Sequence, residues 1–300
     1  MPSFAVSIVF LSLLQAAVVT LPGAPRRSLL DRMRSRWWAL VPPASIVVVI
    51  ALVGLYASSA DALSYLALVA VPPLAAVALG AVMRGARPPL ALAVVPLFAL
   101  AWAVSGSLLG ETAALGLSAL ACVTLGIVLA AVVAPRWLRL GVYAMAVVDT
   151  VLVVADLLQG PNSTLVAAGP TAGLPRLQAV YFGSATMGFG DLFIAATVGA
   201  LLAGDRRTQL QAAALAAILG LGFDLLFFAV DLLPTTVPIA VTLAVFQARD
   251  RRRAFRPAPA ASPYGGRSAA RAAGTGDGGD TAPAPAALEP GRLGSASRRP

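Results

Sequence analysis

The sequence predicts an all-α, polytopic membrane protein with about nine transmembrane helices. Of its residues, 59% are hydrophobic and only 12% are charged. The mean hydropathy is +0.85, which is far above the value of a soluble domain. Apolar segments long enough to cross a bilayer, at least roughly 17 residues each, recur along the chain. Basic residues gather in alternate short loops between them, a pattern typical of membrane topology.

Each apolar segment is expected to form one transmembrane helix. The nine segments lie near residues 3–22, 38–58, 63–83, 89–109, 112–134, 137–159, 179–203, 209–232 and 233–248. The first segment has no basic leader and no clear cleavage site, so we expect it to remain as a helix and not to be removed as a signal peptide. We assign residues 1–253 to a membrane domain. Residues 254–300 are rich in Ala, Pro, Gly, Ser and Arg, which predicts a disordered tail.

Positive charges predict the orientation of the chain. All 22 basic residues are Arg, and they cluster after the first, third, fifth, seventh and ninth segments. The loops between these clusters hold Asp61, Glu111 and a single Arg176. An odd number of spans puts every Arg-rich loop on one side. The positive-inside rule then predicts an external N-terminus and a cytoplasmic C-terminus, in what the composition indicates is a bacterial plasma membrane. The net charge of +9 therefore indicates topology and not nucleic-acid binding.

The composition also excludes several kinds of site. The chain has no His, which excludes Ser–His and Cys–His catalysis and His-ligated metals. Its one cysteine, Cys122, stands alone in an apolar segment, which excludes a disulfide framework or a cysteine metal site. We therefore expect neither a metal nor a cofactor.

Acidic residues inside the apolar segments are the candidate functional groups. A carboxylate at the centre of a span costs about 2.5–3.5 kcal/mol on insertion scales, so its presence needs a reason. Five acidic residues lie within or at the edge of these segments: Asp149, Asp156, Asp191, Asp224 and Asp231.

Depth separates these five residues. Asp149 lies about 12 residues, or roughly 18 Å, from the cytoplasmic start of its segment, and Asp191 lies at a similar depth in the next, antiparallel segment. The two can therefore face each other, whereas Asp156 and Asp231 are expected near the outer face. Asp224 is the one competing partner.

Paired carboxylates in a low dielectric share a proton, so that one serves as acid and the other as base. This is the chemistry of an aspartic protease, in which the base activates a water molecule. Taken singly, Asp149 can equally be a polar residue that joins helices, and the glycines before Asp191 can serve helix packing.

Residues 188–191, Gly188-Phe189-Gly190-Asp191, resemble the GxGD motif of presenilin and signal peptide peptidase, the intramembrane aspartyl proteases. Residues 233–242 resemble the segment around the Pro-Ala-Leu motif of that family, which also opens the ninth helix. The count of nine spans is similar too.

The resemblance implies a presenilin-like fold with residues 137–248 as its catalytic part. Asp149 and Asp191 would be the catalytic residues, and transmembrane peptides or signal-peptide remnants would be the substrates. It also implies substrate binding by the following residues: Gly188, Phe189, Gly190, Pro234, Thr235, Thr236, Val237 and Pro238. The sequence departs from the family at Val148, where a Tyr is usual, and in the Pro-Ala-Leu triplet, which is not intact.

Three alternatives remain open at this point. A prepilin-type peptidase also uses a GxGD aspartate, but usually has Lys where this chain has Phe193. A proton-coupled transporter would use Asp149, Asp191 and Asp224 as a relay. A scaffold or chaperone for membrane helices, or a non-proteolytic member of the family, would act without chemistry.

A protease of this kind must hold its substrate extended, because a helix keeps its backbone bonds internal. The substrate is therefore expected to add as a strand to unpaired backbone near the aspartates. Two places suit this. One is the turn at residues 233–238, where Pro234 and Pro238 are expected to leave carbonyls without helical donors. The other is the loop before Met187.

Overall fold

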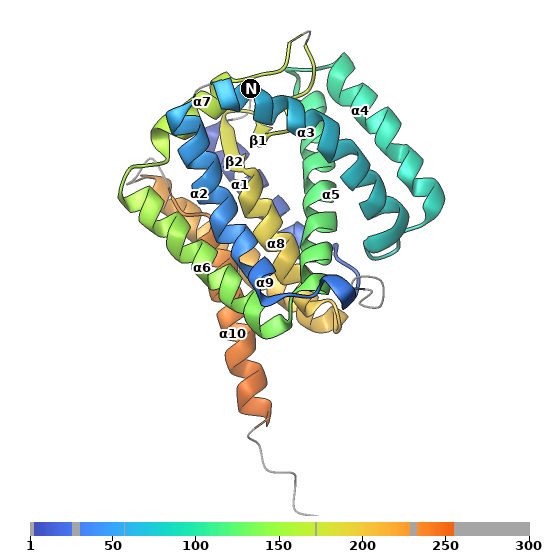
Figure 1. The fold of residues 1–300 in the computed structure, drawn as a ribbon, viewed down its shortest axis with the longest axis vertical. Coiled ribbons are helices and arrows are strands. Elements are labelled where there is room, and N and C mark those ends of the chain that lie inside the picture. The colour runs from blue at the N-terminus through green and yellow to red at the C-terminus, as the bar shows by residue number, and fades with distance from the viewer. Residues whose placement is uncertain (1–2, 26–30, 57, 172, 229–232, 255–300) are drawn as a thin grey trace, which may run out of the picture. The chain divides into compact units, whose positions relative to one another are not determined.

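The computed structural model describes residues 3–25, 31–56, 58–171, 173–228 and 233–254, and these are mostly helical. The chain up to Arg253 forms one compact unit (Figure 1). Its α-helices are α1 (Phe4–Val18), α2 (Val41–Leu55), α3 (Ser58–Val77), α4 (Val94–Ala103), α5 (Leu108–Val132), α6 (Pro135–Val154), α7 (Gln159–Ala167), α8 (Phe189–Leu202), α9 (Arg206–Asp224) and α10 (Thr236–Ala254).

Shorter elements extend or connect these helices. Two strands, β1 (Ala179–Phe182) and β2 (Ala185–Gly188), pair in antiparallel fashion before α8. Short helices of 3₁₀ or π type lie at Asp31–Met33, Arg36–Leu40, Ala78–Val82, Pro88–Ala93 and Leu225–Phe228.

The predicted helical membrane architecture is confirmed at this level. Among the described residues, five helices are long and apolar enough to cross a membrane by length and composition. They are Arg36–Leu55, Ser58–Val82, Leu108–Val132, Pro135–Val154 and Arg206–Phe227. Shorter apolar helices lie at Phe4–Val18, Pro88–Ala103 and Phe189–Leu202. Helix α10 lies in the ninth expected segment, so each of the nine expected segments contains a helix.

Two expected segments differ from single continuous helices. The segment expected at 179–203 begins as the β1–β2 hairpin, and its helix starts only at Phe189. Gly183 at the hairpin turn has a φ of 59°, a left-handed conformation that favours glycine. The segment expected at 137–159 ends as a helix at Val154. Asp156 then takes a φ of 53°, which breaks the helix before α7 begins.

Helix α5 forms the centre of the core. It is buried along most of its length and packs against α8 on one side and against α3 and α4 on the other (Figure 1). Gly126 allows the closest approach to α8: a Cβ atom at this position would lie 2.8 Å from the backbone of Ala196 and Thr197. Small residues let membrane helices pack closely in this way.

The outer helices carry apolar side chains on their free surfaces. On α2, Val47, Val48 and Leu52 are exposed, and on α3, Leu66 and Val69 are exposed. A soluble protein rarely leaves such continuous apolar surface in water. In a bilayer these side chains contact lipid.

Three of the Arg-rich loops meet at one end of the helices. Gln209 is fully buried, and its amide donates to the carbonyl oxygens of Pro22 and Gly199. Its Oε1 accepts from Arg84 (3.3 Å) and from Arg206 (3.1 Å). The loops after the first, third and seventh expected segments therefore lie side by side.

Gly126→Ala should lower the melting temperature by roughly 3–10 °C, because overpacking a close helix contact costs roughly 1–3 kcal/mol. The matched control is Gly116→Ala on the same helix, where a Cβ would meet only Leu97 Cδ2 at 3.8 Å. This control should melt at or slightly above the wild-type temperature, since Ala favours a helix over Gly. Equal melting temperatures for the two variants would contradict the α5–α8 packing.

Candidate active site

Asp191 lies in the first turn of α8, directly after β2. Its Oδ2 accepts a hydrogen bond from the backbone N–H of Gly188 at 3.1 Å. An acidic side chain in the first turn of a helix typically bonds back to the residue that precedes the helix. A Cβ at position 188 would lie 3.0 Å from the same oxygen and would crowd it. Glycine has no Cβ, so it permits this contact. The glycine and the carboxylate are thus in direct contact.

Asp149 lies on the buried face of α6, where it is 6% exposed. The face is apolar apart from this residue, with members spaced at helical intervals, including Val142, Met145 and Leu152. Its Oδ2 accepts a hydrogen bond from Thr236 Oγ1, at 2.6 Å. Thr236 is the first residue of α10, so this bond ties α6 to the start of α10.

The structure brings Asp149 and Asp191 together. Gln15 Nε2 bonds to the carbonyls of Asp191 and Thr235, and the next residue, Thr236, bonds to Asp149. Helices α6 and α8 also pack against each other near the two aspartates. A Cβ on Gly190 of α8 would lie 3.5 Å from Cε of Met145, which lies one turn before Asp149 on α6.

The start of α10 lies next to both aspartates. Thr236 donates to the Asp149 carboxylate, and the Thr235 carbonyl shares the Gln15 amide with the Asp191 carbonyl. Two adjacent residues of one turn thus lie beside Asp149 and the Asp191 backbone. Two carboxylates at one such place can hold and transfer a proton, which is what acid–base hydrolysis requires.

The turn before α10 differs from expectation in its backbone bonding. Pro238 has no N–H, so the Pro234 carbonyl lacks its usual helical donor, and it accepts from the N–H of Val237 at 3.1 Å. The Thr235 carbonyl accepts from Gln15 Nε2 at 3.2 Å. The expectation that these carbonyls stay unpaired is therefore wrong, because a tight turn and a distant side chain supply the donors. Pro234 and Pro238 are themselves buried.

The second expected place of strand addition, before Met187, is the β1–β2 hairpin. The described residues form a sheet of only these two strands, so each strand has a free edge. The turn is held from two sides: Glu111 Oε2 accepts from the N–H of Gly183 at 2.8 Å, and Ser7 Oγ accepts from the N–H of Ser184 at 3.3 Å. These two hydrogen bonds hold the hairpin turn in place, and β2 leads directly into the helix turn that carries Asp191.

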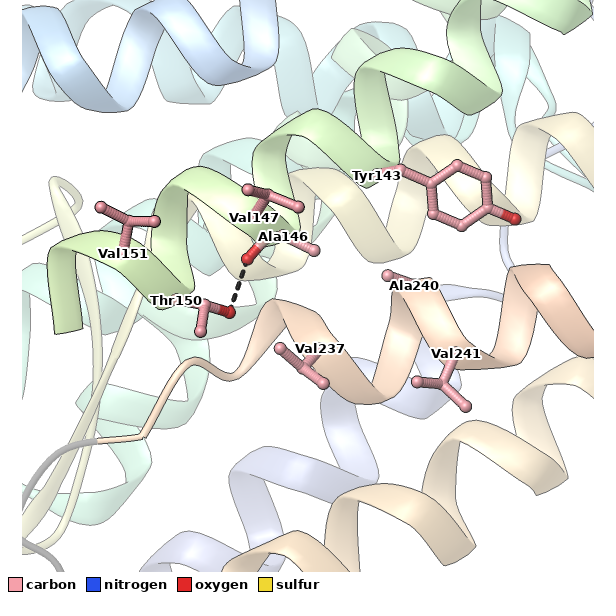
Figure 2. Close-up of a pocket in the computed structure, with 8 residues that line it drawn as sticks. All are labelled: Tyr143, Ala146, Val147, Thr150, Val151, Val237, Ala240 and Val241. Carbon is pink, nitrogen blue, oxygen red and sulfur yellow. Dashed lines mark hydrogen bonds between the residues drawn. The ribbon is translucent and has the colours of Figure 1, made fainter. Parts of the chain in front are cut away.

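A groove of about 310 Å³ runs between α6 and α10 (Figure 2). Its lining residues are Tyr143, Ala146, Val147, Thr150, Val151, Val237, Ala240 and Val241. The Thr150 hydroxyl donates to the Ala146 carbonyl within α6, so this part of the wall is apolar despite its hydroxyl (Figure 2). Asp149 and Thr236 adjoin lining residues in sequence. The sequence carried no signal for this groove, which depends on how the two helices pack.

Phe189 connects the candidate site to the core. Its side chain is partly buried against the core, and its carbonyl accepts from Cys122 Sγ at 3.6 Å. Val237 is partly exposed and lines the groove.

The other membrane carboxylates lie apart from this pair. Asp224 accepts from Ser12 Oγ at 3.0 Å, which joins α9 to α1. Asp156 is exposed just after α6, and Asp231 lies outside the described residues. Within the described part of the chain, no group of three or more Cys, Asp or Glu side chains could hold a metal ion.

Similarity to known proteins does not identify the site. No protein-family model matches the chain, and comparisons with curated proteins and with solved structures give no match. The resemblance of residues 188–191 to the GxGD motif stays a prediction. The geometry of Asp149 and Asp191 carries the functional assignment.

Proposed function

We propose that this protein is an intramembrane aspartyl protease of the GxGD type. It would hydrolyse peptide bonds in transmembrane helices or signal-peptide remnants, with Asp149 and Asp191 as the catalytic pair. The observation that carries the proposal is that two carboxylates, from α6 and α8, lie beside the same turn at the start of α10, where Thr236 bonds to Asp149 and Thr235 shares the Gln15 amide with the Asp191 backbone. A purely structural carboxylate needs no second carboxylate beside it, since like charges repel.

The chemistry follows from a shared proton. One aspartate is ionised and removes a proton from water, and the resulting oxygen attacks the carbonyl carbon of the scissile peptide bond. The other aspartate is protonated and donates to the carbonyl oxygen. The tetrahedral intermediate then breaks its C–N bond as the leaving nitrogen accepts a proton. The side chains of this chain suffice for each step, so the proposal includes no metal or cofactor.

Substrate binding is proposed along the surfaces next to the pair. The apolar groove between α6 and α10 suits an apolar peptide, because its walls have few groups that would need water. A free edge of the β1–β2 hairpin suits an unwound backbone, which finds its hydrogen bonds there and not in water. Residues 188–190 lead from the hairpin to Asp191, and residues 234–238 form the start of the α10 side of the groove, which Val237 lines.

The proposed topology has nine spans in a presenilin-like arrangement, an external N-terminus and a cytoplasmic C-terminus in a bacterial plasma membrane. The meeting of Arg84 and Arg206 at Gln209 supports it, because loops after the third and seventh segments then lie on the same side. In this orientation, which resembles that of signal peptide peptidase, substrates with a cytoplasmic N-terminus are expected to be preferred.

The test is cleavage of a labelled single-span peptide by the purified protein in liposomes. We expect two fragments, cut within the apolar segment, and loss of the products when an aspartyl transition-state analogue is added. A matched substrate of opposite orientation should be cut more slowly. Absence of cleavage of both substrates, together with proton-linked uptake into the same vesicles, would replace the protease with a transporter.

Gly188→Ala is expected to reduce the rate of cleavage about tenfold or more, because its methyl group would press on Asp191 Oδ2 at 3.0 Å. Small displacements of reacting groups cost up to about 100-fold in rate. Gly190→Ala is the matched control, since its methyl would make an ordinary contact of 3.5 Å with Met145 Cε. Initial rates at saturating substrate measure both variants, and a larger loss in Gly190→Ala would contradict the geometry.

A further inference from the structure

Gln15 is a buried polar residue of α1 that contacts both segments of the candidate active site. Its side chain is 3% exposed. Nε2 lies 3.2 Å from the Thr235 carbonyl oxygen and 3.4 Å from the Asp191 carbonyl oxygen. An amide nitrogen carries two hydrogens, so it can donate to both oxygens at once. One side chain therefore joins the start of α8 to the start of α10.

These two carbonyls belong to Asp191 itself and to the residue before Thr236. Thr236 bonds to Asp149. Any change in the spacing of the Asp191 and Thr235 backbones therefore moves Thr236, and Asp149 with it, relative to Asp191. In an apolar interior such bonds are strong and an unpaired partner is unfavourable, so the amide holds this spacing firmly.

The geometry points to Gln15 as a positioning residue of the aspartate pair, and this inference rests on the proposed protease function. Gln15 touches no reacting atom, but it sets the distance between Asp191 and the start of α10, where Thr236 bonds to Asp149. Helix α1 then contributes a positioning side chain to the active site, in addition to spanning the membrane.

The same helix offers a matched control. Ser12 lies one turn before Gln15, is 6% exposed, and bonds to Asp224 on α9 at 3.0 Å. Both residues are buried and polar, and both join α1 to another helix. Of the two, Gln15 is the one whose bonds reach the Asp191 and Thr235 backbones.

The experiment compares Gln15→Met and Ser12→Ala in the full-length protein. Met keeps the length of Gln and removes both donors. We expect kcat for a single-span peptide to fall about 10- to 100-fold with KM changed less than about threefold, since a displacement of about 1 Å costs up to 100-fold. The control should retain kcat within about twofold. Gln15→Asn keeps the amide on a shorter side chain and should show the same loss, and it carries the test if the Met variant does not insert.

Amide hydrogen exchange separates positioning from global loosening and does not depend on activity. Loss of Gln15 should speed exchange at residues 236–241, while α5 and the rest of α8 stay as protected as in the wild type. Wild-type kcat in both Gln15 variants overturns the inference, and so does exchange that rises equally in all helices. If the wild type cleaves nothing, the proposed function fails, and the exchange pattern alone then decides whether Gln15 holds α8 and α10 together.

Discussion

Asp149→Asn and Asp191→Asn are each expected to abolish cleavage of a single-span substrate. An amide cannot take or give the proton that the reaction moves, and losing an acid or base costs roughly 10²- to 10⁴-fold in rate. Asn preserves the size of Asp and can still accept the hydrogen bonds of Thr236 and Gly188 at these two sites. Both variants should therefore insert and melt like the wild type. Initial rates of fragment release in liposomes, with melting temperatures measured alongside, are the readout.

The control for this result is Asp156→Asn. Asp156 is exposed after α6 with a φ of 53°, a conformation that Asn also adopts. We expect this variant to cleave at the wild-type rate. Asp224→Asn tests the remaining membrane carboxylate, which bonds to Ser12, and it should also retain most activity. If Asp149→Asn cleaves normally while Asp224→Asn does not, Asp224 is the partner of Asp191 and the pair is wrongly assigned.

Thr236→Val is expected to lower kcat about 10- to 150-fold. Thr236 donates to Asp149 at 2.6 Å, and a hydrogen bond to a charged group contributes about 1.5–3 kcal/mol, which corresponds to that range in rate. Val keeps the shape of Thr and its β-branched restriction at χ1, but it lacks the hydroxyl. Substrate binding should change little, because the lost bond lies between two groups of the enzyme.

Thr236→Ser separates the hydroxyl from the methyl group. Ser keeps the donor and removes one methyl, so its kcat should stay within about threefold of the wild type, consistent with the loss of a single buried methyl group. Steady-state measurements of kcat and KM on one substrate compare the three proteins. A normal kcat for the Val variant, or an equal loss in both variants, would show that the hydroxyl does not serve Asp149.

Local features of the sequence determine the class of the protein and the position of its helices. An apolar segment in lipid must pair its own backbone groups, so each such segment contains a helix wherever no other partner is available. The same reasoning selects Asp149 and Asp191, because a carboxylate in an apolar segment is unfavourable without a partner. The resemblance of residues 233–242 to a family motif marks Thr235 and Thr236 as candidates from the sequence alone.

Contacts between distant parts of the chain decide the rest. Residues 179–188 belong to an expected transmembrane segment, yet they form a hairpin whose turn is held by Glu111 and Ser7, which are remote in sequence. The turn at residues 233–238 is expected to leave carbonyls without helical donors, and the Thr235 carbonyl in this turn finds its donor in Gln15 on the first helix. A local sequence pattern predicts which backbone groups form hydrogen bonds within their own segment. It does not state which remote side chain reaches the groups that remain, because that depends on how the helices pack in three dimensions.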